Sequence, residues 1–379
     1  MSEKYEEIRR VQRAACASSA RAAQPLLHLA RTTAKRCARW TAASPSALRT
    51  TRVSSCGTCR TNTAASATAR CAKPRSATGS AKKYKTLDNL NHAWWTDFWS
   101  HTYTDWSQIH APVPHGEMNV HGLVLDWKRF VTRQTVDFME MERDAVKAVN
   151  PEIPVTANLM GFYDGLDYFK FGPALDVVSW DNYPQWHTAD NTEIAVFSAM
   201  AHDVMRSVKH ENFLLMESTP SMTNWTPVSM LKRPGMHLLS SMQAMAHGSN
   251  SVQYFQFRKS RGSCEKFHGA VVDHVGNSGP YDFAKTENTR VFRDVQQVGA
   301  VLREMNARGD VYGTAVKPQV AIVYDAEKPL GARRRGGRAT RTRTKSMWRR
   351  CSATTARSGM RACRSTSSIW TATSRATSS

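Results

Sequence analysis

The chain has 379 residues, a formal net charge of +21 and a pI near 9.9, a balance that ordinarily suggests a nucleic-acid partner. The excess charge is confined to the two ends. Residues 8–87 hold 17 Lys and Arg and residues 331–379 hold 13, and neither stretch holds an Asp or Glu. Subtracting 17 and 13 from the 52 basic residues leaves 22 against 31 acidic ones. The middle is therefore an ordinary acidic domain, and a basic nucleic-acid-binding protein is kept only as an alternative.

The two basic ends lack the apolar periodicity of helices or strands. They also hold seven of the eight cysteines: Cys16, Cys37, Cys56, Cys59, Cys71, Cys351 and Cys363. One explanation is a pair of disordered tails that bind RNA or DNA. The other is translation in the wrong reading frame. A back-translation of residues 56–71, read in a shifted frame, gives a peptide that contains the order Asn-Glu-Tyr-Gly-Gly. The same shift turns residues 345–359 into an amphipathic helix, so we expect segments 1–81 and 329–379 to be out of frame.

Regular elements are predicted only between these ends. Apolar residues at helical spacing predict a long helix over residues 127–149. Four short apolar runs follow, at residues 154–160, 175–180, 213–216 and 252–257, with helices between them. Such runs are typical of strands buried in a parallel sheet. Residues 320–324 open a further strand.

Polar and aromatic side chains stand at the ends of three of these strands. The run at 213–216 ends on Glu217, and Ser, Thr and Pro follow at once. This pattern is typical of a strand that delivers an acid to the mouth of an α/β barrel. A Glu that caps a helix or pairs with an Arg is the alternative. Since residues 175–180 lead into Asp181 and Tyr183, and residues 252–257 end in aromatic side chains, the three ends indicate one active-site face.

Taken in order, several motifs resemble the β-galactosidases of glycoside hydrolase family 42. They are Trp94-Trp-Thr-Asp-Phe-Trp99, Ser179-Trp-Asp-Asn-Tyr183-Pro, Met216-Glu217-Ser-Thr-Pro220, Asn224-Trp225, and Phe257-Arg-Lys-Ser-Arg-Gly-Ser-Cys-Glu265-Lys-Phe-His268-Gly. The resemblance runs from residue 82 to about residue 328. It implies an α/β fold, a partial TIM (β/α)8 barrel in which the four predicted strands are strands five to eight. Residues 82–312 would be the C-terminal part of this catalytic barrel, and residues 313–328 the start of a following α/β domain of the family's trimerisation type. Residues 1–81 would replace the strand-four region, and strands one to three have no counterpart.

The resemblance also implies a site. Retaining glycosidases place two carboxyl groups about 5–5.5 Å apart, one as nucleophile and one as acid/base. Glu217 matches the family's nucleophile, Tyr183 would orient that carboxylate, and Trp225 would stack on the sugar. Glu265 and His268 match contacts to sugar hydroxyls. The alternatives are a core aromatic at 183, a loop anchor at 225 and a surface pair at 265 and 268.

Two family features fall in the other reading frame. The acid/base Glu would belong to the shifted Asn-Glu-Tyr-Gly-Gly, where this chain has Thr61, Asn62 and Thr63. A cysteine cluster of the kind that holds structural zinc is also lost there, so we expect no metal and no cofactor. The spacing of Cys56 and Cys59 is interpreted as an accident of codon usage.

The expected function is retaining hydrolysis of terminal, non-reducing β-D-galactosides in carbohydrate catabolism, with a β-galactoside as the partner. An inactive fragment of that enzyme, from a frame-shifted gene, is the alternative. We expect neither a nucleic-acid nor a membrane partner. No apolar run is long enough to span a membrane and no apolar signal core follows the first charges, so the cytoplasm is the expected location. A homotrimer is expected of the intact family, although not necessarily of this chain.

Overall fold

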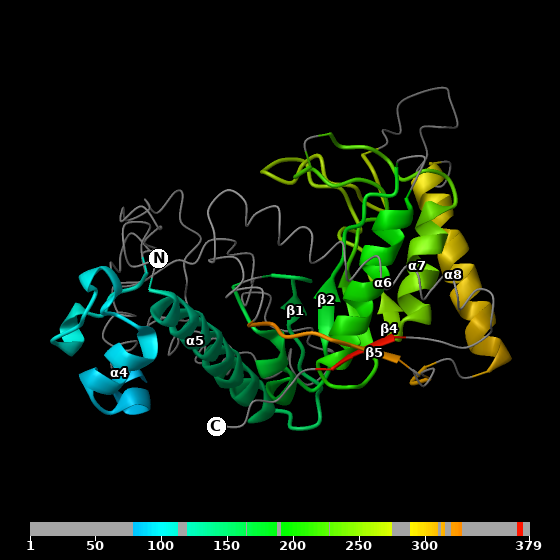
Figure 1. Cartoon of the computed structure of the whole chain (residues 1–379). Helices are drawn as coiled ribbons and strands as arrows, with labels where there is room; N and C mark the ends of the chain where they lie inside the picture. The colour runs from blue at the N-terminus through cyan, green and yellow to red at the C-terminus, as the bar shows by residue number, and fades with distance from the viewer. Residues whose placement is uncertain are drawn as a thin grey trace. The chain divides into compact units, whose positions relative to one another are not determined.

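A computed structural model of the chain describes residues 79–112, 120–163, 165–187, 191–226, 228–274, 289–309, 312–314, 320–327 and 370–373 (Figure 1). Almost all of segments 1–81 and 329–379, which we expected to be out of frame, lies outside these residues. The chain divides into two compact units. The first comprises residues 1–156, 163–176 and 325–345, and the second comprises residues 157–162, 177–324 and 346–379.

Among its described residues, the first unit contains helices α4 (Leu87–Trp94) and α5 (His121–Lys147), and residues 79–84 are also helical. Four short 3-10 turns accompany them: η3 (Phe98–Ser100), η4 (Trp106–Gln108), η6 (Tyr168–Lys170) and η7 (Gly172–Ala174). Leu90 and Trp94 of α4 pack with Leu123 of α5 in a buried cluster. A Cβ atom at Gly122 would overlap the indole ring of Trp94, so glycine at this position lets the two helices lie in contact.

The long helix predicted from residue 127 is confirmed as α5, but it begins earlier, at His121. The reason is that Leu123 and Val124 extend the buried face that Trp127 continues. Gly122, which weakens a helix by about 1 kcal/mol relative to Ala, is tolerated because of the contact with α4.

The second unit contains a four-stranded parallel sheet in the order β1-β2-β3-β4. Its strands are β1 (Asn158–Leu159), β2 (Ser179–Asp181), β3 (Phe213–Glu217) and β4 (Ser249–Val252). The strand order and the parallel direction confirm the α/β class. Phe213, Leu215 and Trp180 are buried, as expected of parallel strands that are covered on both faces.

The last predicted strand, 252–257, is wrong beyond Val252, because regular pairing stops there. The chain continues beside β3 with uneven spacing: Gln253 N donates to Leu215 O at 3.0 Å and Phe255 N donates to Ser218 O at 2.8 Å. It then turns to a neighbouring loop, where Val271 N donates to Gln256 O at 2.9 Å. The side chains after β4 therefore follow loop geometry.

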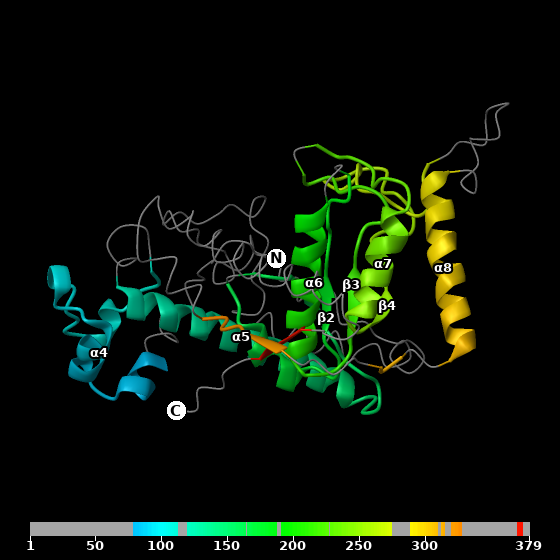
Figure 2. The ribbon, with the colours of Figure 1, turned by 45° about the vertical axis from the view of Figure 1, so that its right-hand side comes forward.

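Three helices accompany the sheet: α6 (Thr192–Ser207), α7 (Met236–Ala246) and α8 (Arg290–Arg308). Thr289 caps α8, its side chain accepting a hydrogen bond from Phe292 N. Helix α8 runs beside α7, as both views show (Figures 1 and 2).

A second, two-stranded parallel sheet joins β5 (Val320–Val323) to β6 (Trp370–Thr373). Strand β5 confirms the strand predicted from residue 320. Strand β6 was not predicted, since it lies in the tail that we expected to be out of frame. Within the described residues, no helix is both long and apolar enough to cross a bilayer.

Candidate active site

The site begins with a pair of carboxyl groups at the ends of two neighbouring strands. Strands β2 and β3 are in register so that Asp181 pairs with Glu217. Asn182 N donates to Glu217 O at 2.9 Å, which joins the two strands up to this point. Both side chains are partly buried. In parallel sheets of this type, functional residues gather at the carboxyl ends of the strands.

Two hydrogen-bond donors hold the carboxylate of Glu217. The Oη atom of Tyr183 donates to Oε2 at 2.8 Å, and Nδ2 of Asn158 donates to Oε1 at 3.0 Å. Each oxygen therefore has a fixed partner, supplied by β1 on one side and by the segment after β2 on the other. The two hydrogen bonds therefore fix the orientation of the Glu217 carboxylate.

Asp181 stands in a different environment. Burial, and secondly the charge of Glu217, raise its pKa to about 8, and a hydrogen bond from the side chain of Asn158 opposes the rise. Its Oδ1 atom is buried without a hydrogen-bond partner. The ordinary pKa of aspartate is about 3.9, so the surroundings of Asp181 favour its neutral form.

Tyr183 connects the carboxylate to two further rings. Trp225 meets it edge to face with ring centroids 5.6 Å apart, and His268 does the same at 5.7 Å. Burial and the charge of Glu217 raise the pKa of Tyr183 far above its ordinary value, so its phenol remains a proton donor. The indole of Trp225 is 58% exposed, which leaves it free to meet a ligand.

The loop after β4 brings Glu265 and His268 to this cluster. His268 is 1% exposed, its Nδ1 lies 3.1 Å from Asn224 Oδ1, and its backbone N donates to Glu265 O at 3.0 Å. Burial lowers the pKa of His268, and the charge of Glu265 acts against that shift. The charge of Glu265 also contributes to the raised pKa of Tyr183, which places Glu265 within electrostatic range of the phenol.

Gly269 fixes this loop against the segment after β3. Its N donates to Met222 O at 2.9 Å. A Cβ atom at this position would overlap Ser221 Oγ and would lie 2.8 Å from Met222 N. Only glycine allows so close an approach, and the approach determines where the neighbouring His268 lies.

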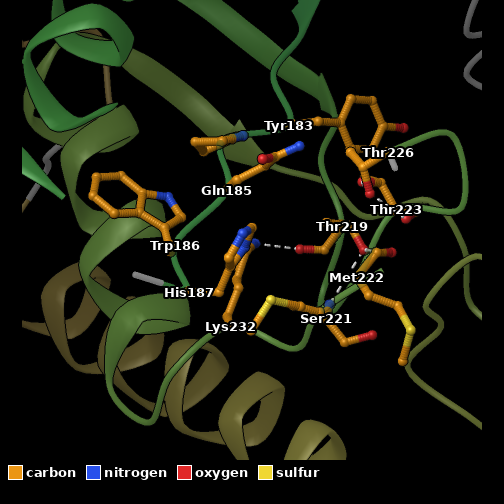
Figure 3. A pocket seen from close by; sticks show the side chains of 12 residues that line it. Tyr183, Gln185, Trp186, His187, Thr219, Ser221, Met222, Thr223, Thr226 and Lys232 are labelled. Carbon is orange, nitrogen blue, oxygen red and sulfur yellow. Dashed lines mark hydrogen bonds between the residues drawn. The ribbon is translucent and has the colours of Figure 1, made fainter. Parts of the chain in front are cut away.

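An open hollow of about 250 Å³, part of it continuous with solvent, lies beside Tyr183 (Figure 3). Its wall includes Trp186, Thr219 and Lys232. The Nζ atom of Lys232 donates to Thr219 O, two residues beyond Glu217. Burial lowers the pKa of Lys232 to about 7. The lysine thus ties the loop that follows β3 to the segment before α7.

The five residues singled out in the sequence therefore lie in one place in the second unit. Glu217, Tyr183, Trp225 and His268 are linked by a hydrogen bond and two ring contacts, and Glu265 lies beside them. Sequence reasoning missed Asn158 and the distinct role of Asp181. The local sequence held no signal for either role, because both depend on how neighbouring strands are paired.

The described residues contain no group of three or more His, Cys, Asp or Glu side chains placed to hold a metal ion. Cys264 is a free, exposed thiol. The cysteines of segment 1–81 lie outside the described residues.

Comparison with known proteins bears on this arrangement. The family model of glycoside hydrolase family 42, described as β-galactosidase, matches residues 62–305. β-Galactosidase BglY of Alicyclobacillus acidocaldarius is 60% identical over 247 residues, which cover 65% of this chain and 34% of that protein. β-Galactosidase Pbg of Clostridium perfringens is 55% identical over 248 residues, or 64% of this chain and 34% of that protein. The chain thus spans about a third of the length of these relatives.

Solved structures agree with the sequence comparison. A catalytic mutant of a GH42 β-galactosidase from G. stearothermophilus is 37% identical, with a TM-score of 0.83 over 99% of this chain and 53% of that chain. A cold-adapted β-galactosidase from Rahnella sp. R3 is 36% identical, with a TM-score of 0.82 over 99% of this chain and 53% of that chain. The parallel sheet is therefore of the TIM-barrel glycosidase type. Since the family model matches well over half of its residues, this chain belongs to glycoside hydrolase family 42.

Proposed function

We propose that this chain is part of a retaining β-galactosidase that hydrolyses terminal, non-reducing β-D-galactosides. The observation that carries the proposal is the carboxylate of Glu217, held by Tyr183 Oη at 2.8 Å and Asn158 Nδ2 at 3.0 Å beside an exposed Trp225. A carboxylate fixed at both oxygens, next to an apolar ring that is open to solvent, suits attack on a sugar. The relatives named β-galactosidase support the choice of galactoside.

In this proposal Glu217 attacks the anomeric carbon and forms a covalent glycosyl-enzyme intermediate. The bond to the leaving oxygen breaks as the ester bond forms, so the negative charge leaves the carboxylate. Tyr183 positions one oxygen through its hydrogen bond and cannot compete as a base, because its pKa is raised. Attack through a pre-oriented oxygen lowers the entropic part of the barrier.

In this proposal the residues around Tyr183 bind the sugar. The exposed face of Trp225 would stack on the C–H groups of the galactose ring. Glu265 and His268 would bond its hydroxyl groups from the loop after β4. Gly269, through its contact with Met222, keeps that loop near the ring of Tyr183.

The acid/base partner is the part that this chain lacks, and we propose that a reading-frame change removed it. No Asp or Glu occurs in residues 8–87. The family model matches residues 62–305, and all of that match from residue 82 onward lies in the stretch that we expected to be in frame. Under this proposal the structural zinc of the family would also return with the corrected frame. Resequencing the gene around the codons for Lys82 and Lys328 tests it directly.

We further propose that β1 to β4 are strands five to eight of the barrel, within residues 82–312, and that β5 opens the following domain from residue 313. The parallel order of the sheet supports the first assignment. A homotrimer and a location in the cytoplasm remain predictions. Sedimentation of the frame-corrected protein, in which the missing upstream strands one to three are also supplied, and cell fractionation test them.

The decisive experiment replaces Glu217 in the frame-corrected protein. Glu217→Gln should abolish hydrolysis of a chromogenic β-galactoside while leaving the fold intact, because loss of a covalent nucleophile removes the main reaction path. Azide should partly rescue the variant and give a galactosyl azide of inverted configuration. The matched control is Glu211→Gln, an exposed glutamate just before the same strand. Near-normal turnover of the Glu217 variant, or no turnover of the corrected parent, would refute the proposal.

A further inference from the structure

The carboxyl groups of Asp181 and Glu217 are neighbours, because their strands pair these two residues. Among the described residues, neither carboxyl group takes part in an ion pair. The charge of Glu217 acts on Asp181. Two negative charges close together and away from bulk water repel each other.

The hydrogen bonds decide which of the two gives up its charge. Glu217 receives one bond from Tyr183 Oη and one from Asn158 Nδ2, so both of its oxygens are satisfied as acceptors. Asp181 accepts a hydrogen bond from the side chain of Asn158, which also donates to Glu217. Its Oδ1 atom is buried without a hydrogen-bond partner. The charge is therefore better supported on Glu217, and the proton belongs on Asp181.

The other groups around Asp181 do not alter this assignment. From β1 it faces the neutral amide of Asn158, and from the segment after β2 it faces the neutral phenol of Tyr183. From β3 it faces Glu217, the charged group that acts on it. The charge of Glu265 acts on Tyr183, whose pKa it raises. The ammonium group of Lys232 donates to Thr219 O in the loop beyond β3.

We propose that Asp181 is a positioning residue that holds a proton beside Glu217, so that the pair carries one negative charge and carries it on the attacking carboxylate. The inference rests on the proposed function of Glu217 as nucleophile. The side-chain amide of Asn158 serves both carboxyl groups, and an ionised Asp181 would accept from it more strongly, which would weaken its hydrogen bond to Glu217. A protonated Asp181 leaves both donors of Glu217 in place. The raised pKa of Asp181, about 8, agrees with this geometry.

A consequence follows for the reaction. When Glu217 becomes an ester it loses its charge, so the repulsion that keeps the proton on Asp181 disappears. Asp181 then ionises more readily, and it recovers its proton from solvent when hydrolysis frees Glu217. No covalent bond to Asp181 forms at any stage, which separates its role from that of a catalytic residue.

The test is a titration of the 379-residue chain that carries ¹³C-labelled aspartate carboxyl groups, followed by NMR. We expect one aspartate signal to titrate near pH 8 and to be missing in Asp181→Asn. In Glu217→Gln the same signal should move to clearly lower pH, because the neutral amide no longer repels an ionised Asp181. The control is Asp273→Asn, an aspartate bonded to Lys259 away from the pair, which should leave the signal unchanged.

Two results would overturn the inference. One is an Asp181 signal that titrates near 4, the ordinary range for aspartate. The other is a high titration point that does not respond to Glu217→Gln, since burial alone would then explain it. If Asp181→Asn fails to fold, the Glu217→Gln titration still decides, because it leaves Asp181 in place.

The titration requires no turnover, so it is independent of the proposed function. Failure of that function would appear elsewhere, as the absence of a covalent adduct on Glu217 when the frame-corrected protein is treated with a fluorinated galactoside. A shifted Asp181 without such an adduct would leave the proton assignment standing and refute only the nucleophile.

Discussion

Tyr183 is the residue through which the carboxylate and the sugar-contact loops meet. Its Oη bonds Glu217, and its ring contacts those of Trp225 and His268. Tyr183→Phe should keep the ring contacts and remove only the hydrogen bond. A hydrogen bond to a charged group contributes about 1.5–3 kcal/mol, so we expect kcat/KM of the frame-corrected enzyme to fall about 10- to 150-fold.

The matched control is Tyr254→Phe. That phenol is also buried, but it contacts Ser241 Oγ at 3.2 Å and no carboxylate. Loss of activity in both variants would show a general effect of removing a buried hydroxyl group. Unchanged kcat/KM in Tyr183→Phe would contradict the orienting role.

Asp181 gives the protein a pH-dependent stability. Its folded pKa, about 8, is above the unfolded value of about 3.9. Between these values the folded state binds more protons than the unfolded state, so the free energy of unfolding falls as pH rises, by up to about 1.4 kcal/mol per pH unit. Asp181→Asn removes this dependence and should stabilise the chain more at about pH 7 than at about pH 5. Urea unfolding of both proteins at the two pH values measures the change in the free energy of unfolding. An equal change at both pH values would contradict the prediction.

At this scale the sequence predicted the contact between Tyr183 and Glu217 but not the second donor to that carboxylate. Glu217 and Tyr183 were found because the end of a parallel strand limits where an acid or a phenol can lie. Asn158 was missed, since the two-residue strand β1 begins with it inside a longer apolar run. Its importance depends on the register of β1 with β2, which no local pattern specifies.

For the helices and strands, the order along the chain was predicted better than the residues at which they begin and end. Four parallel strands were predicted in the right order, because short apolar runs alternating with helical segments allow few other arrangements. The end of the last strand was wrong, since Gln253 and Phe255 bond to β3 with irregular spacing that apolar character does not reveal. The start of α5 was also missed, because Gly122 suits this helix only through its contact with Trp94.

The contact between the two loops at Gly269 leads to a prediction at this scale. Gly269→Ala would force a methyl group onto Ser221 Oγ and the backbone of Met222. Overpacking of this kind costs about 1–3 kcal/mol, and relief requires that the loop carrying His268 move. We therefore expect KM of the frame-corrected enzyme to rise along with a loss of stability. The control is Gly262→Ala in the same loop, where a methyl group meets open space, and a similar effect of both substitutions would contradict the prediction.

On the scale of the whole molecule, two kinds of sequence are joined in one chain. The acidic middle matches a family model and contains every site residue described here. The basic ends hold seven of the eight cysteines and, from residue 8 to 87 and from 331 to 379, no acid. The boundaries drawn from composition stay a prediction, since the family match begins at residue 62, inside the first basic stretch. Strand β6 shows that the second end contributes a short element beside β5.

The last prediction tests the contribution of each end of the chain, by correcting the reading frame of one end at a time. In a chain to which the missing strands one to three have been supplied, correcting the frame upstream of Lys82 should return the acid/base glutamate, whereas correcting it downstream of Lys328 should not. General acid catalysis contributes about 10²- to 10⁴-fold, so we expect hydrolysis of an unactivated galactoside to rise at least that much on upstream correction alone. An aryl galactoside with a good leaving group needs less proton donation, and its hydrolysis should gain less from the same change. Initial rates on both substrates measure the two gains. Substantial activity of a chain corrected only downstream would show that the acid/base group lies within residues 82–328, and would contradict the assignment of the missing glutamate to the upstream frame.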